Sequence, residues 1–298
     1  MRPLNVFVAP TGNAFMGDIA TWIVEAGTLL GHRSTLHDRG GCPHDEAAIN
    51  LVVAPHEFYL LGGFTDRQID DAARTSVPIC TEQPGTPWFD VSRLFCSASR
   101  TVFDINLHGV EALRRHGVDA HHLRLGGVPS MDQRVADRRR RTELLFLGGR
   151  TDRRSRRLAE LAPVLWDRSV DLRLFSFNRP VHDGVDGLVF GRRKYELLAD
   201  TMALLNLHRD DTVPGYFEWA RMIEAMANGC CVVTEPSADF EPLEAGVHFV
   251  EADRPVEIVP MLLDDPQRAE AIGQRAAEAV LEQYPLTAGL EPLLARLE

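Results

Sequence analysis

The stretch Leu144–Leu165, LLFLGGRTDRRSRRLAELAPVL, contains the unit from which the fold is built. Its first four residues are apolar and predict a buried strand, and Gly148 and Gly149 then allow the chain to turn. A helix is expected to begin near Asp152, because apolar residues follow at helical spacing. The apolar face of that helix comprises Leu158, Leu161 and Leu165.

The same alternation of strand and helix continues in both directions along the chain. Apolar runs predict a first series of strands at Leu4–Ala9, Ile49–Ala54, Val77–Cys80, Val102–Ile105 and Leu123–Leu125. A second series is expected at Leu144–Leu147, Val170–Phe175, Ala203–Leu207, Cys230–Thr234 and Val247–Val250. Nearly continuous apolar strands separated by helices are typical of parallel sheets covered on both faces. We therefore predict an α/β protein with two Rossmann-like, doubly wound domains.

The boundary between the two series is visible in the composition. Gly126-Gly127-Val128-Pro129 ends the first series, and a polar segment rich in arginine precedes the next strand. The length of 298 residues is also that of about two domains. We predict an N-terminal domain over 1–128, a linker over 129–141 and a C-terminal domain over 142–284. The last helix, 285–298, is expected to pack back on the N-terminal domain.

The composition and net charge argue against several classes of protein function. The net charge of −11 argues against binding to nucleic acid, and no apolar run approaches the roughly 18 residues of a membrane span. Five cysteines without a Cys-x-x-Cys pair favour reduced thiols in the cytoplasm. Lys194 is the only lysine, so 31 of the 32 Lys and Arg residues are arginine. The sequence predicts no oligomeric state.

Polar residues follow several predicted strands, at the edge where ligands bind open α/β sheets. They include Gly12 and Asn13, His56 and Glu57, Glu82, the Gly148–Arg150 loop and the segment Asn206–Arg209. With two such domains, the expected site is the cleft that they would face.

Arginines crowd the start of the helix that follows Gly149. Arg153 and Arg154 lie in its first turn, after Arg150 in the loop. Cations at a helix N-terminus oppose its dipole, whereas a phosphate bound there would reverse the effect. We expect at least one of these three arginines to contact a phosphate. The alternative is a solvated basic face.

A second informative stretch is Pro214–Glu235, PGYFEWARMIEAMANGCCVVTE. It predicts a helix with a core stripe, ended by Gly229 before a strand. Arg221 and Glu224 lie along its polar flank, and a carboxylate at Glu224 could accept both hydroxyls of a ribose. The alternative is a surface ion pair between Arg221 and Glu224.

Glu224-Ala-Met-Ala-Asn-Gly-Cys-Cys-Val-Val-Thr234 resembles the E-A-M-A-x-G-x-P-V-V element of GT-B glycosyltransferases, and Asn206–Arg209 with Arg221-x-x-Glu224 is most similar to their CgeB-like branch. The resemblance covers about 142–284. It implies a C-terminal domain that binds a nucleoside-diphosphate sugar, with Glu224 on the ribose, and an N-terminal domain that binds the acceptor. It places Gly215, Tyr216 and Phe217 at the diphosphate and sugar. Many relatives carry a further glutamate where this chain has Tyr216.

The predicted chemistry needs neither a metal nor a cofactor. The sequence has no Asp-x-Asp triplet and no Cys/His metal spacing, and arginines with helix amides would offset the charge of the leaving group. Candidate catalytic bases are His56, Glu57 and Glu82. His208 follows a donor-domain strand and is expected to contact the diphosphate or sugar, the alternative being a structural histidine.

We therefore predict a metal-independent glycosyltransferase whose acceptor is a small molecule or a component of the cell envelope. Two alternatives remain open: a non-hydrolysing nucleotide-sugar epimerase, and a catalytically silent GT-B module that binds a nucleotide or a partner.

Overall fold

The computed structural model describes residues 1–136, 139–176, 180–209 and 215–298. It divides into two units, one of Met1–Val128 with Leu286–Glu298 and one of Pro129–Pro285. Asp137 and Arg138 of the predicted linker lie outside the described residues. Each unit contains a parallel sheet, which confirms the predicted α/β class with two Rossmann-like folds.

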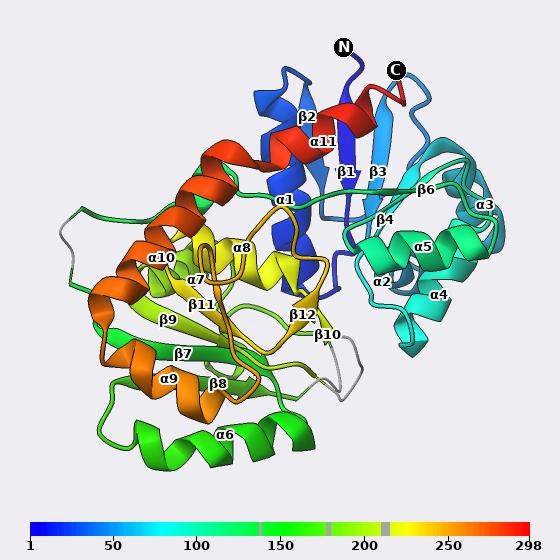
Figure 1. Cartoon of the computed structure of the whole chain (residues 1–298). Helices are drawn as coiled ribbons and strands as arrows, with labels where there is room; N and C mark the ends of the chain where they lie inside the picture. The colour runs from blue at the N-terminus through cyan, green and yellow to red at the C-terminus, as the bar shows by residue number, and fades with distance from the viewer. Residues whose placement is uncertain (137–138, 177–179, 210–214) are drawn as a thin grey trace. The chain divides into compact units, whose positions relative to one another are not determined.

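Unit 1 has a six-stranded sheet in the order β2-β1-β3-β4-β5-β6 (Figure 1). The strands are β1 (Leu4–Phe7), β2 (Ser34–His37), β3 (Ile49–Val53), β4 (Val77–Cys80), β5 (Val102–Asp104) and β6 (Ala120–His122). The helices are α1 (Ala14–Leu29), α2 (Pro55–Leu61), α3 (Asp66–Thr75), α4 (Pro87–Cys96), α5 (Leu107–Arg115) and α11 (Leu286–Leu294).

The end of the chain belongs to unit 1. The helix α11 packs on α1, and Leu286 N donates a hydrogen bond to Gly127 O. A Cβ at Gly289 would lie 2.2 Å from Arg124 O, so only glycine lets this helix approach the segment after β6 so closely.

Unit 2 has a five-stranded parallel sheet in the order β13-β11-β9-β7-β8 and a two-stranded sheet of β10 and β12. The strands are β7 (Thr142–Gly149), β8 (Val170–Phe175), β9 (Thr201–Asn206), β10 (Gly215–Tyr216), β11 (Cys231–Thr234), β12 (Ser237–Ala238) and β13 (Val250–Glu251). The α-helices are α6 (Asp152–Leu165), α7 (Gly191–Ala199), α8 (Trp219–Ala227), α9 (Pro255–Leu263) and α10 (Pro266–Glu278). Shorter turns are η1 (Pro129–Met131), η2 (Val185–Gly187) and the π-helical η3 (Ala279–Gln283).

The core of unit 2 follows the pleat of its strands. Alternate residues of β7, β9 and β11, such as Phe146, Leu205 and Val233, pack against α6, α9 and α10. The opposite face is covered by α7 and α8, which contact β9 and β11 respectively (Figure 1). The predicted stripe on α8 is buried, and Gly229 adopts the left-handed conformation (φ +64°) expected directly after a helix.

Both main sheets reverse their winding direction next to their first strand. In unit 1, β1 lies between β2 and β3, and in unit 2, β7 lies between β8 and β9. Loops leave such a pair of strands in opposite directions, which opens a crevice at the carboxyl ends where ligands bind. The two crevices are thus expected at the ends of β1 and β3 and at the ends of β7 and β9.

Two of the strand predictions need correction, and one edge strand was missed. The predicted strand Leu123–Leu125 is wrong, since β6 ends at His122 and the leucines are buried without continuing the sheet. In the predicted Val247–Val250 strand, Val250 pairs with β11 and Phe249 forms a single bridge to Ala245, whereas Val247 and His248 turn back to Glu244 O. The strand β2 was missed because this half-exposed edge strand, STLH, has a single aliphatic residue.

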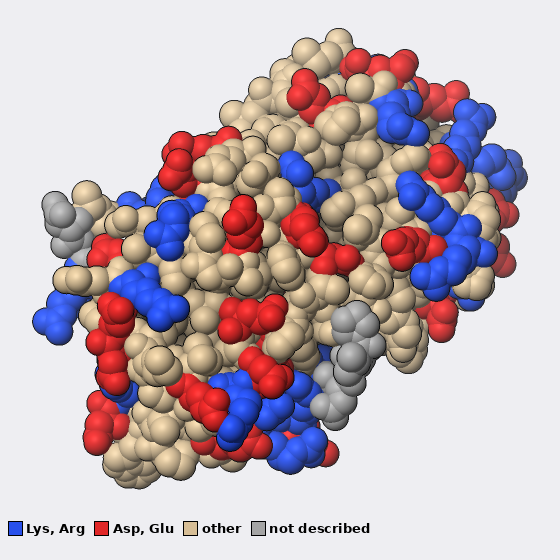
Figure 2. Space-filling view, in the orientation of Figure 1, with Lys and Arg blue, Asp and Glu red and all other residues tan. Residues whose placement is uncertain are grey.

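Among the described residues, no helix is both long and apolar enough to span a membrane. Acidic and basic side chains are interspersed on the surface that Figure 2 shows.

Candidate functional site

Arg154 ties together three segments at the carboxyl ends of the unit 2 strands. Its Nη1 donates to Gly149 O (3.2 Å), at the end of β7, and its Nε donates to Leu207 O (2.9 Å), just after β9. Its Nη2 lies 3.3 Å from Oε1 of Glu218, the residue before α8. Because all three guanidinium nitrogens are engaged and the residue is 2% exposed, Arg154 is a buried structural residue that holds the segments of the crevice together.

Positive charge is in excess around Arg154. Burial, followed by repulsion from Arg221, lowers the pKa of Arg154 to about 10, and Arg209 and Arg153 add to the repulsion. Among the described residues, Glu218 is the carboxylate that acts in the opposite direction on this guanidinium. A bound anion would relieve this repulsion, so the crevice at the ends of β7 and β9 favours negatively charged ligands.

Arg153 is held by a different carboxylate. Its Nη1 and Nη2 lie 2.6 and 2.8 Å from the two oxygens of Glu235, at the end of β11. Glu235 also accepts a hydrogen bond from His208 N (2.8 Å). Burial raises the pKa of Glu235, but the bonds from Arg153 and His208 outweigh burial and lower it. Arg153 therefore stabilises the edge of the sheet, whereas Arg150 is exposed in the loop after β7.

His208 lies against Gly215. Its Nε2 donates to Pro236 O (2.9 Å), since a carbonyl can only accept, which leaves Nδ1 as the ring atom for a further partner. A Cβ at Gly215 would lie 2.2 Å from His208 Nε2, so the close approach of the loop before α8 requires glycine.

The segment after Gly215 is held by a second small sheet. Tyr216 in β10 pairs with Ala238, and Phe217 N donates to Ala238 O. The Phe217 ring is buried against Trp219 and Phe249, at centroid distances of 4.9 and 5.3 Å. Phe217 thus anchors this loop in the core, and half-buried Gly215 and Tyr216 are the parts nearer the surface.

On α8, Arg221 and Glu224 have separate partners, contrary to the alternative of a mutual ion pair. Arg221 Nη1 lies 2.8 Å from Asn206 Oδ1 and 2.9 Å from Glu218 Oε2. Glu224 Oε1 lies 2.6 Å from Nζ of Lys194, on α7. Lys194 was not predicted as a site residue. Its burial could have been predicted from the sequence, because it lies beside Tyr195 and four residues before Leu198, on the buried side of α7.

In unit 1, the ends of β1 and β3 meet through Glu57. Its Oε2 accepts from Asn13 N (2.8 Å) and its Oε1 accepts from Asn13 Nδ2. A Cβ at Gly12 would lie 2.5 Å from Glu57 Oε2, so glycine makes room for this carboxylate. The structure brings the predicted residues Gly12, Asn13 and Glu57 together, with Glu57 serving the start of α1.

His56 belongs to a row of three side chains. Ser92 Oγ lies 2.9 Å from His56 Nδ1, and His56 Nε2 lies 3.6 Å from Glu82 Oε1. Burial lowers the pKa of His56 to about 4, so the ring is neutral at pH 7. A neutral ring whose Nε2 carries the proton points that proton at Glu82 and accepts from Ser92. The Glu82 side chain is 21% exposed and that of His56 only 4%, so Glu82 is the member that solvent can reach.

Asp104 lies at the end of the neighbouring strand β5. Its Oδ1 accepts from Asn106 N (2.7 Å), and its Oδ2 is buried without a hydrogen-bond partner among the described residues. Burial, opposed by the bonds from Asn106 and reinforced by Glu82, raises the pKa of Asp104 well above its ordinary value.

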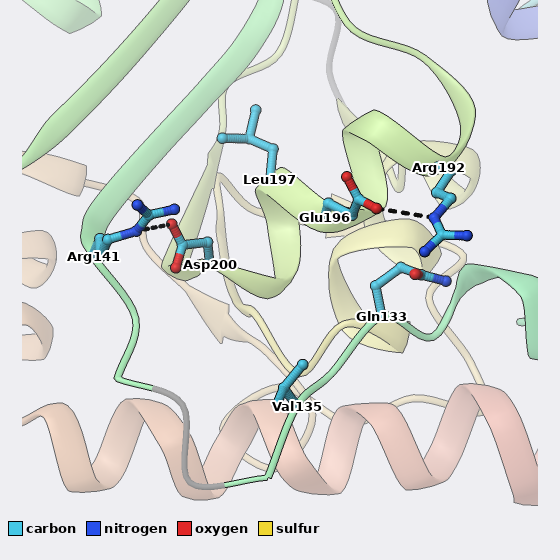
Figure 3. A pocket seen from close by; sticks show the side chains of 7 residues that line it. All are labelled: Gln133, Val135, Arg141, Arg192, Glu196, Leu197 and Asp200. Carbon is cyan, nitrogen blue, oxygen red and sulfur yellow. Dashed lines mark hydrogen bonds and ion pairs between the residues drawn. The ribbon is translucent and has the colours of Figure 1, made fainter.

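A cavity of about 400 Å³ lies elsewhere in unit 2 (Figure 3). Arg141 and Asp200, which pair at 2.7 Å, directly precede β7 and β9. These residues place the cavity at the amino ends of the strands, opposite the crevice at Arg154. It is lined by Gln133, Val135, Arg141, Arg192, Glu196, Leu197 and Asp200.

Comparison with known proteins gives one family match. Residues 157–295, just under half of the chain, match the family described as glycosyl transferase-like. No curated protein sequence matches the chain.

Solved structures share the fold at low sequence identity. TarM of S. aureus, crystallised with UDP, is 12% identical with a TM-score of 0.56, over 84% of this chain and 55% of its own. This chain thus spans about half the length of TarM. AviGT4, a glycosyltransferase involved in avilamycin A biosynthesis, is 15% identical over 99% of this chain and 98% of its own, with a TM-score of 0.52.

A protein from Listeria monocytogenes assigned as a UDP-N-acetylglucosamine 2-epimerase has a TM-score of 0.51 at 10% identity, over 100% of this chain and 96% of its own. These likenesses establish the GT-B type of fold, which glycosyltransferases and this epimerase share. The family match adds that residues 157–295 are similar to a glycosyl transferase-like domain.

Proposed function

We propose that this protein transfers a glycosyl group from a nucleoside-diphosphate sugar to a small-molecule or cell-envelope acceptor, without a metal or other cofactor. The observation that carries the proposal is the excess of positive charge around Arg154 at the crevice of unit 2. A diphosphate is an anion of matching charge, and Arg209, Glu218 and Arg221 of this crevice lie within the glycosyl transferase-like match, which begins three residues after Arg154.

On the donor side, the crevice offers separate groups for the parts of the donor. Arg150 and Arg209 are exposed and Arg221 is half-buried, and these arginines would meet the diphosphate at the end of β7, whose last two residues are Gly148 and Gly149. His208 Nε2 lies beside Gly215 and donates to Pro236 O, so the other ring nitrogen, Nδ1, would bind the diphosphate or sugar. Glu224 would hold the ribose, as its resemblance to the E-A-M-A element implies.

Arginine can replace a metal in this reaction. Departure of the nucleoside diphosphate builds negative charge on the leaving oxygen, and fixed guanidinium groups stabilise such charge in a site that excludes water. EDTA is accordingly expected to leave both binding and turnover unchanged.

On the acceptor side, the geometry favours Glu82 over His56 and Glu57 as the base. Glu57 is committed to Asn13, and His56 is buried, neutral and aimed at Glu82. Glu82 would accept the proton of an acceptor hydroxyl while His56, anchored by Ser92, orients its carboxylate.

A thermal-shift series with UDP, GDP, dTDP, CDP and ADP tests the donor site, each with and without EDTA. We expect one diphosphate to raise Tm regardless of EDTA, since a ligand that binds the folded state stabilises it. Glu224→Gln should abolish most of that rise, whereas Glu270→Gln, an exposed control on α10, should keep it. Unchanged Tm with all five would contradict the proposal.

The epimerase is the second candidate, because the Listeria protein matches the chain over its full length. Incubation with UDP-N-acetylglucosamine in the absence of any acceptor separates the two. Interconversion of the sugar at C2 would favour the epimerase, and dependence of sugar release on an added acceptor would favour the transferase.

A further inference from the structure

Lys194 is the only lysine of the chain, and it is buried. It lies in the first turn of α7, the helix that packs on α8. A buried ammonium is costly unless it is paired, so its partner indicates what it does.

That partner is Glu224. Nζ lies 2.6 Å from Glu224 Oε1, and the two side chains are 7% and 3% exposed. The ring of Phe190, directly before α7, lies 5.3 Å from Nζ and adds a cation–π contact. Two contacts, one from α8 and one from the residue before α7, therefore hold this ammonium and, through it, the carboxylate.

The pair controls the chemical state of Glu224. A buried carboxylate without a cation would tend to take up a proton, and a protonated carboxyl accepts hydrogen bonds less well than an ionised one. A carboxylate that binds a diol needs both its charge and a fixed rotamer, because the hydroxyl hydrogens must find its lone pairs.

We propose that Lys194 is a positioning residue for the donor: it keeps Glu224 charged and oriented to accept the ribose hydroxyls of the nucleotide. This inference rests on the proposed function, and it extends that function to the recognition of ribose against 2′-deoxyribose. Lys194 itself contacts no ligand in this account.

The test compares ribose and 2′-deoxyribose nucleotides by calorimetric titration. UDP, GDP, 2′-deoxy-UDP and 2′-deoxy-GDP are each titrated into four proteins: the wild type, Lys194→Met, Glu224→Gln and the double variant. Arg192→Met is the matched control, because Arg192 lies on the same helix with its side chain 78% exposed.

We expect the wild type to bind the ribonucleotide about tenfold more tightly than its 2′-deoxy form. Lys194→Met should reduce this ratio to about one, and adding it to Glu224→Gln should change the ratio no further, because both substitutions remove the same interaction. Arg192→Met should keep the wild-type ratio. A purely structural role would lower Tm and leave the ratio intact.

A measurement on the unsubstituted protein covers the case in which Lys194→Met fails to fold. Protein labelled with 15N-lysine has a single side-chain ammonium resonance, since the chain has one lysine. UDP or GDP should shift that resonance more than the 2′-deoxy form does. Equal shifts, or an unchanged ratio in Lys194→Met, would overturn the inference while leaving the donor site in place. Failure of all five diphosphates of the thermal-shift series to bind the wild type would instead overturn the proposed function, and this inference with it.

Discussion

The two crevices have the same topology and opposite chemistry. In unit 1, the residues at the strand ends are carboxylates and a neutral histidine: Glu57, Glu82, Asp104 and His56. In unit 2, the equivalent ends are joined by Arg154, with Arg153, Arg209 and Arg221 around it, and the carboxylates there, Glu218 and Glu235, are paired to arginines. The winding of the sheet therefore fixes where ligands can bind, whereas the few residues after each strand fix which charge they carry. This division matches a proton-accepting site in one unit and an anion-binding site in the other.

The largest effect is expected at Glu82. Replacement by Gln keeps the shape of the side chain but cannot accept a proton, so the turnover number should fall about 100-fold or more with the donor KM unchanged. Steady-state kinetics would measure the fall in turnover number, with an acceptor that the wild type is first shown to turn over. Glu46→Gln, an exposed substitution in unit 1, serves as the control. Full activity of Glu82→Gln would show that Glu82 is not the catalytic base.

Arg154→Met should disrupt the crevice of unit 2. It leaves the carbonyl oxygens of Gly149 and Leu207 and the carboxylate of Glu218 without this donor, so we expect a loss of about 3 kcal/mol in the free energy of unfolding. Urea denaturation measures the loss. Arg156→Met, exposed on the same helix, should change stability by less than about 0.5 kcal/mol. Equal free energies of unfolding of the two variants would show that the contacts of Arg154 do not stabilise the protein.

The buried histidine of unit 1 predicts a pH dependence of stability. The folded pKa of about 4 lies below the ordinary value of 6.5, so between these values the unfolded chain binds a proton that the folded chain excludes. The part of the free energy of unfolding that depends on His56 should thus be at its maximum above pH 6.5 and fall as the pH decreases towards 4. The loss due to His56 at pH 4 is roughly 2–3 kcal/mol.

The comparison of wild type with His56→Gln isolates this contribution, since all other titratable groups are the same in the two proteins. The denaturation curves of the two proteins should approach each other as the pH falls from 6.5 to 4. A stability difference independent of pH would contradict the neutral, buried ring.

The smallest effect is expected at the start of α1. Glu57→Ala removes the acceptor of Asn13 N, and loss of such a helix-end contact costs about 1 kcal/mol. Chemical denaturation should show that decrease, with Glu46→Ala as the unchanged reference. A decrease of 3 kcal/mol or more would give Glu57 a larger structural role than the one assigned here.

The sequence predicted the fold where the hydrophobic pattern is strong and missed it where the pattern is weak. Val77–Cys80 was placed to the residue because it is a buried, continuous apolar run, and Val170–Phe175 because apolar and polar residues alternate along this edge strand. The edge strand β2 and the short strands β10 and β12 were not, since pairing at an edge needs little burial.

The candidate site shows a related limit. Spacing along the chain located the strand ends, and with them Glu57 and Arg154, while the resemblance to the E-A-M-A element singled out Glu224 on a helix. It could not assign partners distant in sequence, such as Ser92 to His56 or Lys194 to Glu224, because those contacts depend on helix packing. Nor could it show that Arg154 turns inward to backbone carbonyls while Arg150 remains exposed.

The central claim is that the crevice of unit 2 binds a nucleoside diphosphate, and amide hydrogen exchange with the stabilising diphosphate tests it most directly. The account predicts slower exchange on binding in the segments 148–154, 206–209 and 215–224, with no change around the cavity of Figure 3 at 191–200. Protection confined to that cavity, or to the strand ends of unit 1, would contradict the claim.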